Sequence, residues 1–301
     1  MPMDSFRQVT VQGSAITARA YHSTVIHRGW LYVVMGFNGA ARLRCSFCTN
    51  NGTNWRQRDN FVDTKGNGIA PRDSFGLCAH NEKIYLLGGW NGATRYRHVY
   101  VTSDMVRWTR LQDAPWTARY GFYCCSFNGC LWVIGGSDAS GNLNDVWWTR
   151  DGVSWIQENN APWAIRRYMG GIVYNNRIYI IGGFGASYYN DVYYTDDGRN
   201  WARMENNAAF PARGSHAVES FGAPKLVMVG GQGTSNAYYD DLWHSGAGNQ
   251  WFLGDNVIPM GSLRGHSMDF FNNRLVVVGG INGAATYRNQ VWEANTQMFK
   301  V

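Results

Sequence analysis

The 301-residue sequence contains little charge and no long apolar run. Asp, Glu, Lys and Arg together make up 16% of the residues. No uninterrupted apolar segment reaches the ~18 residues of a membrane-spanning helix, and no apolar stretch behind basic residues marks a secretory signal. We therefore expect neither a membrane span nor a signal peptide, and we expect the protein to be intracellular and cytoplasmic.

Two further patterns are missing. No segment has the 3.6-residue apolar period of an amphipathic helix, which favours an all-β chain. The net charge is +6, but the 27 basic residues are scattered through the sequence without a Lys-rich run. Nucleic-acid binding needs basic residues gathered on one face, so the pattern argues against a nucleic-acid partner.

The six cysteines do not form a metal or disulfide framework. Cys45 and Cys48 lie on one expected strand, where residues three apart point to opposite faces and cannot share a metal ion. Cys124 and Cys125 alternate in the same way. Buried thiols behave as small hydrophobic groups. We expect structural, reduced cysteines, with no metal and no cofactor.

What the sequence does contain is a repeated Gly-Gly pair that closes a short apolar run. The pairs are spaced 47 to 49 residues apart, at Gly88-Gly89, Gly135-Gly136, Gly182-Gly183, Gly230-Gly231 and Gly279-Gly280. A degenerate sixth copy ends at Met35-Gly36, and a tryptophan follows most copies, as Trp55, Trp108, Trp155, Trp201 and Trp251. A period of this size corresponds to one propeller blade.

Each repeat contains four short strand-like segments separated by turns. In the third copy, apolar and aromatic runs at 120–127, 131–134 and 145–148 and a last run around Trp155 are separated by turns rich in Asn, Asp and Gly. Such turns favour antiparallel hairpins. The repeats start near residues 17, 70, 117, 164, 211 and 262. We predict one all-β domain over residues 1–301, a six-bladed β-propeller of four-stranded antiparallel blades.

Three features that recur in the repeats resemble those of a known repeat family. An arginine lies 16 residues before the closing glycine in five copies, with one extra turn residue in the fifth: Arg19, Arg72, Arg119, Arg166 and Arg213. In the last copy Arg264 lies one position late. With the Gly-Gly pair and the distal tryptophan, this pattern resembles the kelch-repeat family, and the resemblance covers nearly the whole chain.

The ring has two candidates for its closing strand. Residues 3–10 resemble the outer strand of a blade, with Phe6 where the tryptophan usually lies. Residues 298–301 could take the same place. We favour the N-terminal strand, because Phe6 precedes Arg19 by nearly the interval that separates Trp201 from Arg213.

Antiparallel pairing locates a candidate binding face, because the repeat arginine and the residues after Gly-Gly meet at one end of each blade. The expected ligand-binding residues are Arg19, Arg72, Arg119, Arg166, Arg167, Arg213, Arg264, Phe37, Asn38, Trp90, Asn91, Asp138, Phe184, Gln232 and Asn282. Guanidinium groups donate paired hydrogen bonds to carboxylates and phosphates. In peptide-binding kelch domains such positions contact acidic peptides, so the resemblance implies a non-enzymatic interaction module for an acidic peptide or protein surface.

Other interpretations stay open. The repeat arginines can instead tie the blades together by bonding carbonyl groups. The resemblance also admits an enzyme similar to kelch-type sialic acid mutarotases, which would bind an anionic small molecule and use Glu219, Asp269, His216 or His266 as acid and base. A three-histidine metal site formed by His22, His216 and His266 is disfavoured, because the family places histidine there for inter-strand bonding. A structural subunit of a larger assembly is the third possibility.

Overall fold

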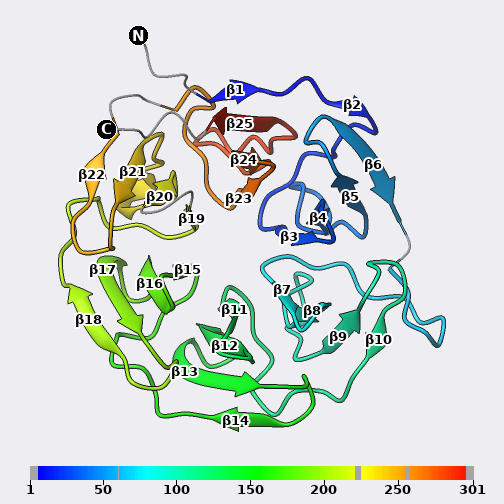
Figure 1. The fold of residues 1–301 in the computed structure, drawn as a ribbon, viewed down its shortest axis with the longest axis horizontal. Coiled ribbons are helices and arrows are strands. Elements are labelled where there is room, and N and C mark those ends of the chain that lie inside the picture. Colours follow the sequence, from blue (N-terminus) through cyan, green and yellow to red (C-terminus); the bar gives the residue numbers. More distant parts are fainter. Residues whose placement is uncertain (1–5, 60, 221–224, 255–257, 296–301) are drawn as a thin grey trace.

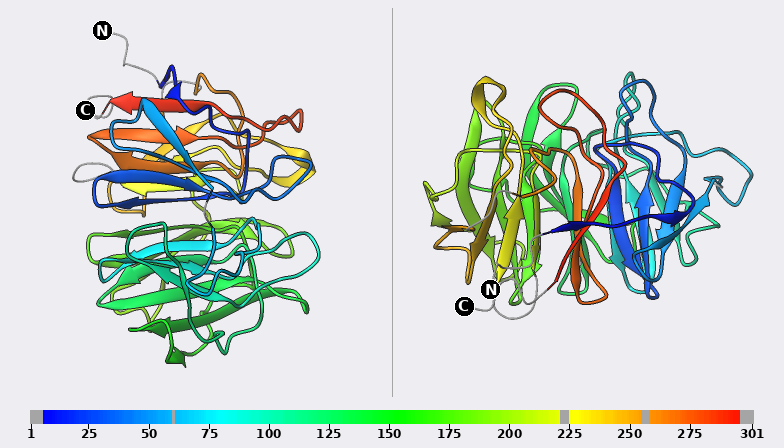
Figure 2. Two further views of the ribbon diagram at one scale, coloured as in Figure 1. Left: turned by 90° about the vertical axis from the view of Figure 1, so that its right-hand side faces the viewer. Right: turned by 90° about the horizontal axis from the view of Figure 1, so that it is seen from above.

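A computed structural model describes residues 6–59, 61–220, 225–254 and 258–295. Six separate sheets stand around a central opening (Figure 1), which confirms the predicted six-bladed β-propeller. Seen from the side, the strands run roughly along the axis of the ring (Figure 2).

The blades follow one another in chain order, each built from the inside of the ring outward. Blade 1 contains β3 (Ser23–His27), β4 (Trp30–Val34), β5 (Ser46–Thr49) and β6 (Asn54–Arg58). Blade 2 contains β7 (Gly76–His80), β8 (Lys83–Leu87), β9 (Val99–Thr102) and β10 (Thr109–Arg110). Blade 3 contains β11 (Tyr123–Phe127), β12 (Cys130–Ser137), β13 (Asn142–Thr149) and β14 (Trp155–Gln157).

The second half of the ring repeats this order. Blade 4 contains β15 (Gly170–Tyr174), β16 (Arg177–Phe184), β17 (Tyr188–Thr195) and β18 (Ala202–Glu205). Blade 5 contains β19 (Ala217–Ser220), β20 (Leu226–Val229), β21 (Leu242–Ser245) and β22 (Phe252–Leu253). Blade 6 contains β23 (Ser267–Phe271), β24 (Arg274–Val278), β25 (Val291–Asn295) and β1 (Arg7–Gln8).

The outer strand of blade 6 comes from the N-terminal part of the chain. β1 pairs antiparallel with β25, with Arg7 opposite Glu293 (Figure 1). Phe6 is 3% exposed and joins the apolar cluster between blades 5 and 6. The alternative strand at 298–301 lies outside the described residues. β2 (Gln12–Gly13) then pairs parallel with β6, so the first sheet has a fifth strand, which has no counterpart in the described residues of the other repeats.

The Gly-Gly pair joins neighbouring blades. Both Gly88 (φ 56°) and Gly89 (φ 95°) adopt left-handed conformations that favour glycine. A methyl group on Gly88 would lie 2.9 Å from the carbonyl oxygen of Arg119. The amide of Gly89 donates to that same carbonyl at 2.8 Å, and equivalent bonds join all six neighbouring pairs of blades, including Gly280 to Arg19. Glycine is therefore favoured where two backbones meet, and the second position of the pair is glycine in all six blades.

A second ring of hydrogen bonds surrounds the channel. One residue of each blade, two positions after the repeat arginine column, donates its amide to the equivalent residue of a neighbouring blade. The members are Tyr21, Ser74, Gly121, Tyr168, Ser215 and Gly265, and all six have a positive φ. This ring holds the inner strands at equal spacing and fixes the diameter of the channel.

The apolar core lies between the blades rather than within them. One cluster contains Val25 of blade 1, Phe75 of blade 2 and the buried Trp108. Face-to-face burial of this kind makes each blade depend on its neighbours for stability. Among the described residues the one helical segment is the short 3₁₀ turn η1 (Thr234–Asn236), and no helix there has the length and apolar character needed to cross a bilayer.

Candidate functional site

The five arginines of the repeat column are buried inside their own blades. Arg19, Arg72, Arg119, Arg166 and Arg213 are 0–1% exposed. Each Nη1 donates to the carbonyl at the closing position of its blade, for example Arg72 to Gly88 at 2.8 Å and Arg213 to Gly230 at 2.8 Å. Each Nε donates to the carbonyl two residues earlier, as Arg72 does to Ala70. Their donors are thus engaged largely inside the protein.

Three of these arginines also have an aspartate partner. Arg119 and Asp145 form a two-pronged ion pair, with Nη1 2.6 Å from Oδ1 and Nη2 2.7 Å from Oδ2. Arg213 and Asp241 form the same pair at 2.6 and 2.7 Å, and Arg166 pairs with Asp191. These pairs join the inner and third strands of a blade, as the structural interpretation of the column expects.

The polar residues expected after the Gly-Gly pairs mostly hold their own loops. Asn38 accepts hydrogen bonds from the amides of Ala40 and Ala41. The side-chain oxygens of Asn91, Asp138 and Asn282 accept from loop amides in the same way. Such bonds stabilise tight turns, so these side chains shape the loops of the candidate face.

The partly exposed rim of the channel is built differently, from alternating arginines and aromatic rings. The residue after each column position bridges to the residue after each Gly-Gly pair, which places Arg167 beside Phe184 and Arg264 beside Ile281. The Arg42 guanidinium lies between Phe37 and Trp90, 4.3 and 4.8 Å from their ring centres, and bonds Asp73. Trp90 stacks on Tyr120. These contacts bring Phe37, Trp90, Phe184, Arg167 and Arg264 to one rim.

Arg167 and Arg264 have neutral partners. Arg167 Nη1 donates to Asn142 at 2.9 Å, and its guanidinium lies 5.0 Å from the Phe184 ring. Arg264 Nη1 donates to the Gln232 side-chain oxygen, and its guanidinium lies 5.1 Å from the Tyr238 ring. In the described part of the chain neither forms an ion pair, and the Nε of each is buried without an acceptor.

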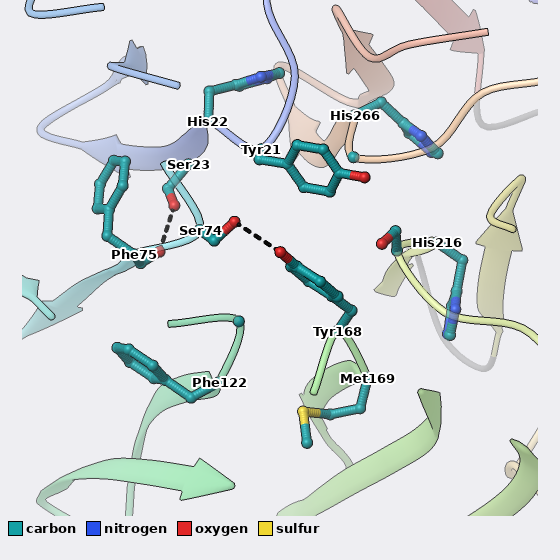
Figure 3. A pocket seen from close by; sticks show the side chains of 13 residues that line it. Tyr21, His22, Ser23, Ser74, Phe75, Phe122, Tyr168, Met169, His216 and His266 are labelled. Atoms are coloured by element: carbon teal, nitrogen blue, oxygen red, sulfur yellow. Dashed lines mark hydrogen bonds between the residues drawn. The ribbon is translucent and has the colours of Figure 1, made fainter. Parts of the chain in front are cut away.

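Below this rim the channel contains a cavity of about 150 Å³. Tyr21 and Tyr168 come from opposite sides of the ring and reach toward each other across it (Figure 3), with ring centres 5.4 Å apart. The Tyr168 hydroxyl lies 3.4 Å from the Ser74 hydroxyl. Burial raises the pKa of Tyr21, while Arg264 and a hydrogen bond to Ser215 oppose that rise. The two tyrosines therefore partly close the channel under the arginine rim.

Comparison with protein families agrees with this geometry. A family model described as the kelch motif matches residues 71–101 and 118–148, which cover most of the inner three strands of blades 2 and 3. The buried arginine, the closing glycine pair and the bond between them recur outside those two blades as well. The six-bladed propeller thus carries kelch motifs in two of its blades, in agreement with the resemblance of its repeats to the kelch family. A search of curated proteins found no match.

Three histidines of this kelch propeller line the cavity, and their side chains pack between neighbouring blades. His22, His216 and His266 are each 7% exposed, and His216 Cε1 lies 3.3 Å from where a Cβ on Gly182 would be. Burial lowers the pKa of His216 to about 3 and that of His266 to about 4, so both are neutral at pH 7. No group of three metal-binding side chains occurs among the described residues.

Glu219 and Asp269 lie deeper, at equivalent positions of the inner strands of blades 5 and 6. Burial and then the nearby Asp269 raise the pKa of Glu219 to about 8. Burial raises the pKa of Asp269 to about 6, against a hydrogen bond from Thr24, and its Oδ2 is buried without a partner among the described residues. The inner strands of blades 5 and 6 thus contain two carboxyl groups whose pKa values are raised by burial.

Sequence reasoning missed part of the rim. The repeat pattern singles out neither Arg42, Tyr188 and Tyr238 nor Arg95, whose guanidinium lies 5.6 Å from the Tyr120 ring. A signal existed, because Arg42 and Arg95 each follow the second glycine of their pair by six residues. That position pairs with the residue after the Gly-Gly pair, as Arg42 does with Phe37 and Arg95 with Trp90, and so returns the chain to the rim.

Proposed function

We propose that this kelch propeller is a non-enzymatic interaction module that binds an acidic peptide or an acidic protein surface at the rim of its channel. Kelch propellers commonly serve as protein-interaction modules, and the kelch motifs of blades 2 and 3 support such a role. The binding residues in the proposal are Arg167 and Arg264, with Trp90, Phe184 and Tyr238 as the aromatic wall.

The observation that carries the proposal is the pair of guanidinium groups without a carboxylate. Arg167 and Arg264 extend from blades 4 and 6, and between them blade 5 has Gly214 at the equivalent position. Burial raises the pKa of Tyr188, and the charges of Arg264 and Arg167 both act against that rise. Both cations therefore act on the same Tyr188 side chain, from the two blades on either side of Gly214, and we expect a ligand carboxylate to bind beside them.

The buried arginines of the repeat column are less suited to bind a ligand than the two rim arginines. Arg119, Arg166 and Arg213 already have aspartates, whereas the two rim arginines bond only neutral amide oxygens. A charge-assisted bond to a ligand carboxylate would replace a weaker neutral one. The flanking rings add contact area for an apolar side chain of the ligand.

The enzyme interpretation fits the arrangement less well. Asp269 follows Arg264 by five residues along the inner strand of blade 6, a separation of roughly 16 Å in extended chain. Tyr21 and Tyr168 cross the channel at the level of the next residue. A small sugar acid held by the rim arginines would therefore lie on the other side of these two tyrosines from Glu219 and Asp269.

The test is the binding of an acidic peptide library by the parent and by Arg264→Ala, measured by display and then by calorimetry. We expect the substitution to weaken binding about 10- to 100-fold, the value of one charge-assisted hydrogen bond. Arg150→Ala, at an exposed turn beyond β13, is the matched control and should bind like the parent.

Thermal unfolding of the three proteins separates binding from stability. Equal melting temperatures with weaker binding by the Arg264 variant would support the rim site. Absence of any binder, or equal affinity of parent and Arg264 variant, would refute the proposed site and leave the propeller as a scaffold.

A further inference from the structure

The ion pair of the repeat arginine is incomplete in blade 1. In blade 3 the aspartate partner follows its arginine by 26 residues, as Asp145 follows Arg119. In blade 1 the residue at the same interval from Arg19 is Cys45, and its Sγ accepts a hydrogen bond from Arg19 Nη2 at 3.2 Å. The thiol therefore occupies the place of a carboxylate.

The arginine that faces this thiol is a buried cation without an anion. Arg19 is 0% exposed, and among the described residues it pairs with no carboxylate. Its other donors bond the carbonyls of Thr17, Met35 and Cys45. Burial lowers the pKa of Arg19, and Cys45 is the one side chain that opposes this change. The Nη2 of this buried cation is thus aimed at the sulfur, where an anion could pair with it.

Cys45 is also one of the more accessible thiols of the chain. All six cysteines are free, and four of them, Cys48, Cys78, Cys125 and Cys130, are buried. Cys45 and Cys124 are partly exposed, but no arginine donates a hydrogen bond to Cys124 among the described residues. Of the two partly exposed thiols, Cys45 is therefore the one that a buried arginine bonds.

We propose that Cys45 is an oxidation site, at which a hydroperoxide converts the thiol to a sulfinate that completes the missing ion pair with Arg19. A sulfinate has two oxygens and one negative charge, as the aspartates of blades 3, 4 and 5 have. The Cys45 sulfinate would give blade 1 an ion pair with Arg19 like the arginine–aspartate pairs of blades 3, 4 and 5.

The reaction takes two equivalents of hydroperoxide. In the first step the Cys45 thiolate attacks one peroxide oxygen, an S–O bond forms, the O–O bond breaks, and the leaving oxygen takes up a proton to give an alcohol or water. The sulfenic acid repeats the step with a second hydroperoxide and becomes a sulfinic acid, which releases its proton. Sulfur loses two electrons in each step and the peroxide gains them.

One test supplies the anion genetically. Cys45→Asp should raise the melting temperature of the chain by roughly 2–4 °C over Cys45→Asn, its neutral counterpart of equal shape. Both variants remove the thiol, so their difference isolates the charge. Equal melting temperatures, or a lower one for the Asp variant, would overturn the proposal that this place accepts an anion.

The second test uses hydrogen peroxide on the parent, with peptide mass spectrometry and thermal unfolding as readouts. We expect the peptide containing Cys45 to gain two oxygen atoms before the peptides of the four buried cysteines, and the melting temperature to rise with that gain. Cys45→Asn should show no such rise. Faster oxidation at another cysteine, a disulfide at Cys45, or a fall in melting temperature would refute the site.

Discussion

At the scale of single residues, one position in the segment that leads into the inner strand separates two roles of arginine. Arg166 is 1% exposed and bonds Asp191, whereas its neighbour Arg167 lies on the rim against Phe184. Blade 6 has Leu263 in the buried column and Arg264 on the rim. The alternation of a strand sends adjacent side chains to different surroundings, so the same residue type serves structure in one place and is available to a ligand in the other.

Blade 2 offers a residue-scale prediction, because Arg72 also lacks a carboxylate. His98 follows Arg72 by the interval that separates Arg119 from Asp145. Burial lowers the pKa of Arg72 to about 10, and its Nη2 is buried without a partner among the described residues. His98→Asp should therefore raise the free energy of unfolding by about 1–3 kcal/mol, because the cation is already buried and gains a charged partner.

Chemical denaturation at pH 7 measures this change, with His98→Asn as the neutral control. A gain for the Asp variant alone identifies the ion pair as its cause. A loss for the Asp variant relative to Asn would mean that burying the new carboxylate costs more than the pair contributes.

At the scale of elements, the ring is closed by β1 on β25, and two different contacts hold β1. Phe6 is buried among blades 5 and 6, while Arg7 pairs with Glu293 from a side chain that is 72% exposed. A buried phenyl ring contributes far more than an exposed ion pair. We therefore attribute most of the closing free energy to Phe6.

The corresponding prediction compares two substitutions in the same strand. Phe6→Ala should lower the free energy of unfolding by about 3–5 kcal/mol, because it leaves a cavity between two blades. Arg7→Ala should change it by less than about 1 kcal/mol. Urea denaturation of both variants checks the order, and equal losses, or no loss for Phe6→Ala, would contradict closure by an apolar anchor.

At the scale of the whole molecule, the channel gathers buried groups whose pKa values move in opposite directions. The lowered pKa values of His216 and His266 supply stability that is complete above about 6.5 and is lost as the pH falls toward 3–4. The raised pKa values of Glu219 and Asp269 supply stability that is complete in acid and is lost as the pH rises toward 8 and 6. The propeller should therefore be most stable in mildly acidic solution.

Glu219→Gln tests the part of this pH dependence of stability that comes from Glu219. The variant keeps the shape of the protonated side chain and cannot ionise, so its stability relative to the parent should increase as the pH rises from 4.5 to about 8 and then level off. Thermal unfolding of both proteins across that range measures the difference. A difference that does not change with pH would show that Glu219 ionises in the folded protein as it does in the unfolded chain.

Much of the architecture follows from local patterns in the sequence. The Gly-Gly pairs, the Asn and Asp turns and the Phe6 to Arg19 interval predicted six blades of antiparallel strands, because hairpin turns and backbone contacts impose local requirements on residue type. The parallel strand β2 was not predictable in this way, since its partner β6 is about 40 residues away and no repeat pattern relates the two segments.

The sequence by itself determined the repeat, the strand order within a blade and the end of the ring at which the arginines and the Gly-Gly loops meet. Only the tertiary structure decided which of the repeat arginines form an ion pair. Arg119 and Arg19 share one repeat position, and their difference depends on whether Asp145 or Cys45 lies opposite after 26 intervening steps of chain. Burial and charge pairing are properties of neighbours brought together by folding, and a repeat position alone does not contain them.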